Sequence, residues 1–186
     1  MRYVLALLIF LIAAPAWGDN DLVLPTVEFS ATAVHQSGAY QTKDTIYYAG
    51  GKLRIERGHG FTTTILDLTT RTQCILMVNH TYLILPMDDE LFRRFIAQTV
   101  DTTGATKVGT AVLDGMQTTK YAFGDAGELK AAGYYWLTKT GIMIRRDYDD
   151  GVYGQDVHHK EFLTNIKIGK QPLQLFGIPA GYTKAK

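Results

Sequence analysis

Apolar and polar residues alternate along most of the chain, as they do in strands that bury only one face. The alternation is clearest over 27–33 and 52–56, where Leu53 and Ile55 point one way and charged residues point the other. Similar segments occupy 61–68, 106–113, 116–123 and 157–167, with a shorter one at 173–176. Short strands joined by tight turns, without a strand–helix rhythm, predict an antiparallel sheet.

Two neighbouring segments, 74–78 and 83–85, are apolar at every position instead of alternating. A strand with one face in water should alternate, so these strands are expected to be covered on both faces, by a helix, a lid or a ligand. The turn that precedes Thr81 contains Asn79 and His80, and we expect Asn79 to supply its positive φ.

Two segments have helical patterns. Asp88 can cap a helix over 89–100, and Asp125 with Glu128 marks a short second helix over 126–132 that Gly133 ends. The apolar stripe of the main helix consists of Leu91, Phe92, Phe95, Ile96 and Val100.

The N-terminus has the composition of a secretory signal peptide. Arg2 precedes an apolar run over 3–17, and Ala16 and Gly18 are small residues before Asp19. The run is shorter than the roughly 20 apolar residues of a membrane span, which favours cleavage over an uncleaved anchor. We therefore expect a cleaved peptide at 1–18, a single domain at 19–186, and no stable membrane anchor afterwards.

The net charge and the number of cysteines limit which binding partners and which cellular compartment can be expected. The formal net charge is +1 and disappears when Arg2 is removed, so nothing predicts a nucleic-acid partner. Cys74 is the single cysteine of the chain, so no internal disulfide can form and no lipid-anchoring cysteine follows the cleavage site. An exported chain with one thiol suits a bacterial periplasm.

The residues that could bind a metal or act in catalysis are better explained by structural roles. His158 and His159 are adjacent in a strand, so they point to opposite faces and cannot chelate a metal together. Cys74 lies in an apolar strand, where its thiolate is disfavoured. Asp88–Glu90 is typical of a helix start, and the acidic residues before Gly151 lack the pattern of a calcium loop. No metal, cofactor or enzyme activity is expected.

The segment YYWLTKTGIMIRR, at 134–146, predicts a β-hairpin that turns at Gly141. Trp136 then shares a face with Tyr134, while Arg145 and Arg146 fall on opposite faces and cannot form one basic patch.

Six sequence motifs follow one another along the chain: FSATAVHQ, YYAGGKLRIE, YLILP, DGMQTTKY, YWLTKTGIMIRR and FLTNIKIGKQPLQLFGIPAGYTK. Together they resemble the periplasmic lipoprotein-carrier-like (LolA/LolB-like) superfamily over most of 27–184, and are most similar to its uncharacterised exported domains. The resemblance implies an α+β fold, mainly antiparallel β. It would be an unclosed, strongly curved β-barrel with one main helix and a short second helix covering the concave face. Carriers of this superfamily use an arginine to hold a helical lid closed; the segment it contacts is absent here, so Arg54 inherits no such role.

These features suggest a periplasmic carrier that sequesters a hydrophobic ligand, such as a lipid, an acyl chain or a lipidated protein. The expected lining is Leu53, Ile55, Leu76, Leu83, Leu85 and Trp136, beneath a lid helix that carries Leu91, Phe92, Phe95 and Ile96. The same residues would also suit a closed core. The alternative function is a non-enzymatic interaction or sensor module of the envelope, without a small ligand.

Overall fold

The computed structural model of the protein describes residues 22–58, 62–87, 100–101, 105–124, 132–152 and 155–185. Its elements are β1 (Leu22–Val23), β2 (Phe29–Ser37), β3 (Tyr40–Ala49), β4 (Lys52–Arg57), β5 (Thr62–Asp67), β6 (Thr72–Met77), β7 (Thr81–Pro86), β8 (Val100–Asp101), β9 (Thr106–Leu113), β10 (Met116–Gly124), β11 (Ala132–Thr138), β12 (Met143–Val152), β13 (Gln155–Ile168), the 3₁₀ helix η3 (Leu173–Phe176) and β14 (Thr183–Lys184). The signal-peptide and lid-helix predictions concern residues outside these ranges.

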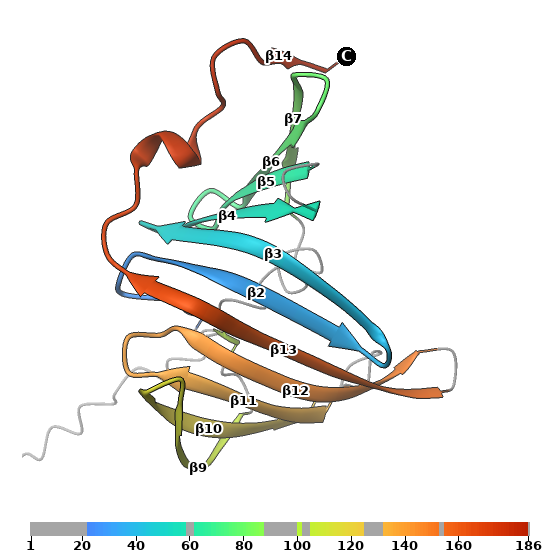
Figure 1. Ribbon diagram of the computed structural model, residues 1–186, viewed down its shortest axis with the longest axis vertical. Coiled ribbons are helices and arrows are strands. Elements are labelled where there is room, and N and C mark those ends of the chain that lie inside the picture. The colour runs from blue at the N-terminus through green and yellow to red at the C-terminus, as the bar shows by residue number, and fades with distance from the viewer. Residues whose placement is uncertain are drawn as a thin grey trace, which may run out of the picture.

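One 12-stranded sheet, in the order β14-β7-β6-β5-β4-β3-β2-β13-β12-β11-β10-β9, contains almost all of these strands (Figure 1). It consists of two antiparallel meanders, β2–β7 and β9–β13, that meet where β2 pairs with β13. Among the described strands, only β14 is parallel to its neighbour. The short strands β1 and β8 form a separate pair.

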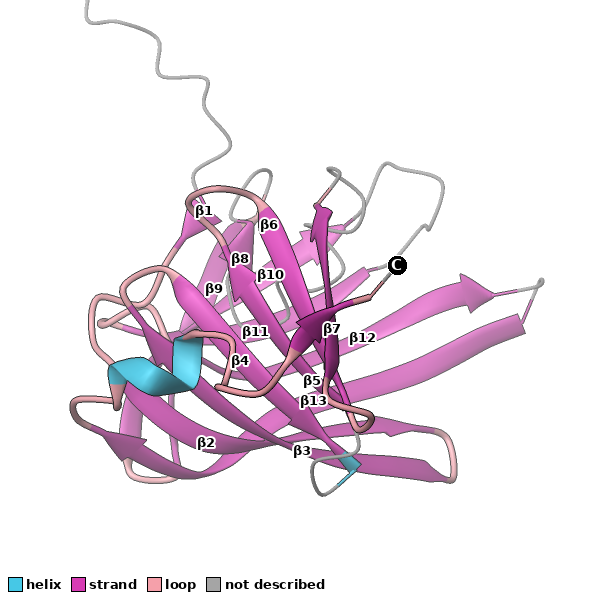
Figure 2. Cartoon of the chain, turned by 90° about the horizontal axis from the view of Figure 1, so that it is seen from above, coloured by secondary structure: helices cyan, strands magenta, loops and turns pink. Residues whose placement is uncertain are grey.

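The sheet twists and curves strongly, as Figure 2 shows from above. We call the face that carries the main apolar cluster the inner face, and its opposite the outer face. The main cluster includes six fully buried side chains: Phe29, Ile46, Leu53, Leu66, Ile142 and Leu163. A second, smaller cluster contains Tyr135, Leu137 and Met143. The core therefore has a large part and a small part on one curved sheet.

The expected α+β class is wrong for the described part of the chain, which is almost entirely sheet. Both predicted helices lie mainly outside the described residues, and each ends at a residue that is a strand residue instead. Val100 pairs with Val23, and Ala132 pairs with Asp149, so their backbone groups belong to β-ladders. Apart from Gly58, which is a 3₁₀ residue directly after β4, the helical element described is η3. None of the described helical segments is long and apolar enough to cross a membrane.

The hairpin at 134–146 is confirmed. Gly141, with φ of 82°, ends the turn between β11 and β12, and its N–H donates to the Thr138 carbonyl at 3.0 Å. In the turn before β7, the positive φ belongs to His80, at 58°, not to Asn79. The Asn79 side chain instead accepts a hydrogen bond from the Thr81 N–H at 3.2 Å.

The C-terminal segment was expected to contain a strand at 173–176, and this expectation is wrong. Pro172 precedes the segment, which forms η3 beside β4 and pairs with no strand. Arg54 fixes it, since its guanidinium donates to the Leu175 carbonyl at 2.8 Å. The chain then runs on to β14, which pairs with the start of β7 at this edge of the sheet (Figure 1).

Candidate functional site

Cross-strand partners share a sheet face, so the register shows which predicted lining residues lie together. Leu53, Leu66, Gln73 and Leu85 form one row across β4–β7. Ile55, Thr64, Ile75 and Leu83 form the adjacent row. Four of the six candidates, namely Leu53, Ile55, Leu83 and Leu85, are therefore on the inner face.

Burial decreases along these rows towards β7. Leu53 and Ile55 are 1% and 7% exposed and belong to the main cluster, whereas Leu83 is half-buried and Leu85 is 39% exposed. The apolar inner face is therefore closed in the middle of the sheet and accessible at β7.

The other two candidates, Leu76 and Trp136, face outwards. Leu76 pairs with Thr63 and Tyr82, one position out of step with the inner rows. Trp136 is opposite Lys120 and Arg145, and each of these cations lies 5.0 Å from its ring centre. A ligand on the inner face would not reach either side chain. The four lid-helix residues lie outside the described ranges.

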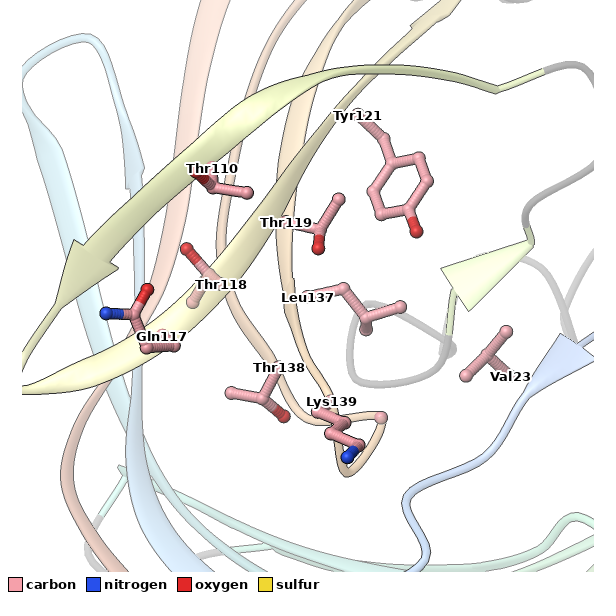
Figure 3. Close-up of a pocket in the computed structure, with 10 residues that line it drawn as sticks. Val23, Thr110, Gln117, Thr118, Thr119, Tyr121, Leu137, Thr138 and Lys139 are labelled. Carbon is pink, nitrogen blue, oxygen red and sulfur yellow. The ribbon is translucent and has the colours of Figure 1, made fainter.

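A recess of about 500 Å³ opens on the inner face beside β10 and β11. It is lined by Val23, Thr110, Gln117, Thr118, Thr119, Tyr121, Leu137, Thr138, Lys139 and Gly141. Figure 3 shows the side chains of Thr119, Tyr121 and Leu137 extending into the same space from neighbouring strands, with Val23 on its other side. Tyr121, Leu137 and Val23 also belong to the second cluster, so the floor of the recess is apolar and its rim is rich in hydroxyls.

Two of these hydroxyl groups have structural roles. Thr118 Oγ1 donates to the Ala111 carbonyl, and Thr138 Oγ1 accepts from the Ile142 N–H, both at 2.9 Å. The rim groups that remain for a ligand come from Thr110, Gln117, Thr119 and Lys139. Sequence reasoning missed this site, because its threonines are ordinary strand residues until the register brings them together.

The chain preceding β2 holds the recess in shape. The Thr26 N–H donates to the Thr140 carbonyl at 2.8 Å, which fastens this segment to the β11–β12 turn. A Cβ atom on Gly141 would lie 2.8 Å from the Leu24 carbonyl oxygen, so only glycine permits this approach. The contact brings Val23 to the recess.

A polar cluster lies elsewhere on the inner face, around Glu161. This carboxylate accepts hydrogen bonds from His35 at 3.2 Å and from the Tyr148 hydroxyl at 3.3 Å. Burial alone would raise the pKa of Glu161, but the His35 bond and the nearby charge of Arg146 lower it overall. The same bond raises the pKa of His35. The pair therefore favours the ionised carboxylate and the protonated imidazole.

The adjacent histidines behave as their spacing predicts. His158 is exposed and bonds Asp149 at 2.8 Å, whereas His159 lies on the inner face, stacked on Tyr148 with ring centres 4.9 Å apart. Among the described residues, no group of three or more His, Cys, Asp or Glu side chains could hold a metal ion. Burial raises the pKa of the Cys74 thiol, which disfavours its reactive thiolate form.

Arg54 points away from the inner face, because it pairs with Tyr47 and Ile65 on the outer face. Its partners are Glu56, at 2.8 Å, and the Leu175 carbonyl. Its role is to hold the C-terminal segment against the sheet.

Several solved structures are similar to this one. An uncharacterised conserved protein from Thermus thermophilus superposes with a TM-score of 0.56 and 13% identity, over 86% of this chain and 90% of that one. MucB gives 0.53 and 16%, over 86% of this chain and 59% of that one. This chain shares its fold with both of these proteins.

The Pseudomonas aeruginosa MucA/MucB complex contains the same fold, with a TM-score of 0.51 and 17% identity, over 81% of this chain and 56% of that one. This chain thus spans less than two thirds of MucB. No protein-family model and no curated protein sequence matches the chain. At these identities the similarity establishes the fold alone.

Proposed function

We propose that this protein is a non-enzymatic binding protein of the bacterial periplasm that carries a hydrophobic ligand on the inner face of its sheet. The ligand would be a lipid, an acyl chain or a lipidated protein. The recess beside β10 and β11 is the observation that carries this proposal. Its volume of about 500 Å³ falls within the range of roughly 300–1,000 Å³ that is usual for small-molecule sites.

The chemistry of the recess suits an amphipathic molecule. Its apolar floor, formed by Tyr121, Leu137 and Val23, would take the hydrocarbon part of the ligand and remove it from water. Each methylene group buried there would contribute about 0.8 kcal/mol. The rim hydroxyls and Lys139 would bond the polar end. Binding by burial alone is reversible, as a carrier requires.

The exposed ends of the apolar rows, at Leu83 and Leu85, would provide a second contact surface for the hydrocarbon. Leu53 and Ile55 would support this surface from within the core, because both are already buried.

A protein segment is the second candidate ligand. The main cluster is closed, as an interaction module would require, and a similar structure contains MucB in complex with MucA. An apolar peptide segment could occupy the same recess without any lipid.

The test is binding of a fluorescent fatty-acid probe, together with native mass spectrometry and organic extraction of protein purified from the periplasm. Thr119→Trp fills the recess, so it should weaken probe binding by at least about tenfold. Thr45→Trp, at an exposed outer-face position of β3, is the matched control and should bind like the wild type.

A wild-type protein that contains no lipid and binds no probe would disprove the carrier function. Probe binding that Thr119→Trp leaves intact would show that the ligand lies elsewhere.

The periplasmic location has its own test. The exported protein should begin at Asp19, because the signal peptide is expected to be cleaved after Gly18. N-terminal sequencing that finds Met1 on the purified protein would contradict this location.

A further inference from the structure

The strand β9 ends the 12-stranded sheet opposite to β14, and its outer edge pairs with no described strand. Every residue of β9 is at least partly exposed. Val108 and Val112 are 51% and 57% exposed, so this edge presents apolar side chains as well as backbone hydrogen-bonding groups. An open edge of this kind is a template for pairing with another strand.

Natural proteins usually protect such edges with charges, prolines or β-bulges. Here, protection is confined to the first part of β9, where Lys107 lies next to a bulge opposite Lys120 and Tyr121. The residues at 109–113 include no charge and no proline. The second half of the strand is therefore free to accept a partner.

At the other edge of the sheet, the start of β7 is occupied by a strand of the protein itself. The β14 strand pairs in parallel with β7, through Thr183 opposite Thr81 and Lys184 opposite Tyr82. A β9 strand from a second molecule would have to displace β14 in order to pair with the start of β7. The assembly that avoids this displacement is a closed one, in which two identical β9 edges meet about a two-fold axis.

We propose that β9 pairs antiparallel with β9 of a second copy of this chain. Centred on Ala111, the pairing uses only the unprotected part of the strand; it places Thr110 opposite Val112 twice and Gly109 opposite Leu113 twice. No like charges face each other, and β-branched pairs of this kind stabilise antiparallel strands. Because a single strand edge engages few residues, we expect the dimer to be weak and dependent on concentration.

Sedimentation velocity on the purified protein, from low to high micromolar concentration, tests this proposal. The wild type should shift from monomer to dimer. Val112→Lys places a charge in the unprotected part of both edges and should weaken the dimer at least about tenfold. Val78→Lys, at a 66%-exposed valine just after β6, is the matched control and should dimerise normally.

Hydrogen exchange locates the interface. Amides of β9 should become more protected as the wild-type concentration rises, and those of Val112→Lys should not. A wild type that stays monomeric would overturn the proposal, as would a dimer that Val112→Lys leaves unchanged. A monomer whose β9 amides are protected only by an added extended peptide would assign the edge to a partner strand instead.

Discussion

The two ends of the sheet are built differently. Strands β2–β5 supply most of the main cluster, and β14 pairs with the start of the edge strand β7. Strands β9–β11 contribute to a smaller cluster, line the recess and leave an open edge. One end concentrates the buried apolar surface that stabilises the fold. The other keeps the accessible surface from which binding is proposed, so substitutions there can change binding without unfolding the protein.

A matched pair of substitutions tests this division most strongly. Phe29→Ala removes a ring that is 0% exposed in the main cluster, and should lower the free energy of unfolding by about 3–5 kcal/mol. Phe123→Ala, at a partly buried ring of the second cluster, should cost only about 1–2 kcal/mol. Urea unfolding measures both, and equal losses would show that the two ends contribute alike.

The turn beside the recess should be sensitive to one methyl group. Gly141→Ala forces a Cβ towards the Leu24 carbonyl at a positive φ, and should cost about 1–3 kcal/mol of unfolding free energy. Since the same turn carries Lys139, probe binding should weaken too. Gly109→Ala is the control, because a Cβ there meets nothing within 4 Å. If Gly141→Ala lowered the free energy of unfolding no more than Gly109→Ala does, the close contact between the turn and Leu24 would not constrain the turn as described.

The His35–Glu161 pair should make stability depend on pH. The raised pKa of His35 contributes stability that is fully present below about 6.5 and is lost as pH rises through the folded value. The lowered pKa of Glu161 contributes stability above about 4.5 that is lost as pH falls through its folded value.

The contribution of the pair should therefore be largest between these limits, at about 1 kcal/mol or less because His35 is 43% exposed. Melting temperatures of the wild type and His35→Gln, compared across pH, measure it. A difference that stayed constant with pH would rule out the ion pair as its source.

The smallest effect is expected at the accessible end of the inner rows. Leu83→Glu should weaken binding of the fatty-acid probe by only a few-fold, about 1 kcal/mol, because Leu83 is half-buried and distant in the sheet order from the recess. Thr81→Glu introduces the same charge on the same strand and face, without removing an apolar side chain. It therefore shows how much of the effect on probe binding comes from the charge alone. Unchanged binding in Leu83→Glu would remove β7 from the proposed ligand surface.

Local patterns predicted much of this fold. The period of two located most strands, and the TKTG turn located the 134–146 hairpin, because both depend on residues close in sequence. The same spacing correctly placed Trp136 on the face of Tyr134, but could not show that this face is the outer one.

Long-range arrangement was not available from these patterns. The run 74–78 is apolar throughout, so its periodicity gave no orientation for Leu76; the register with β5 and β7 decides it. The recess likewise depends on β9, β10 and β11 meeting the segment at Val23. The segment 173–176 resembles a strand in composition, yet it has no neighbour to pair with and forms a 3₁₀ turn after Pro172.

The pairing of β2 with β13 has a consequence for how the molecule acquires its structure. His35 meets Glu161, and Phe29 meets Ile168, across more than a hundred intervening residues. During synthesis or export, the strands of the first meander emerge long before β13. Until β13 emerges, one edge of β2 has no strand to pair with. Closing so long a loop is slow, and it leaves a window for aggregation. The rate-limiting step of refolding should therefore be formation of this seam, and a chaperone that shields β2 should raise the yield.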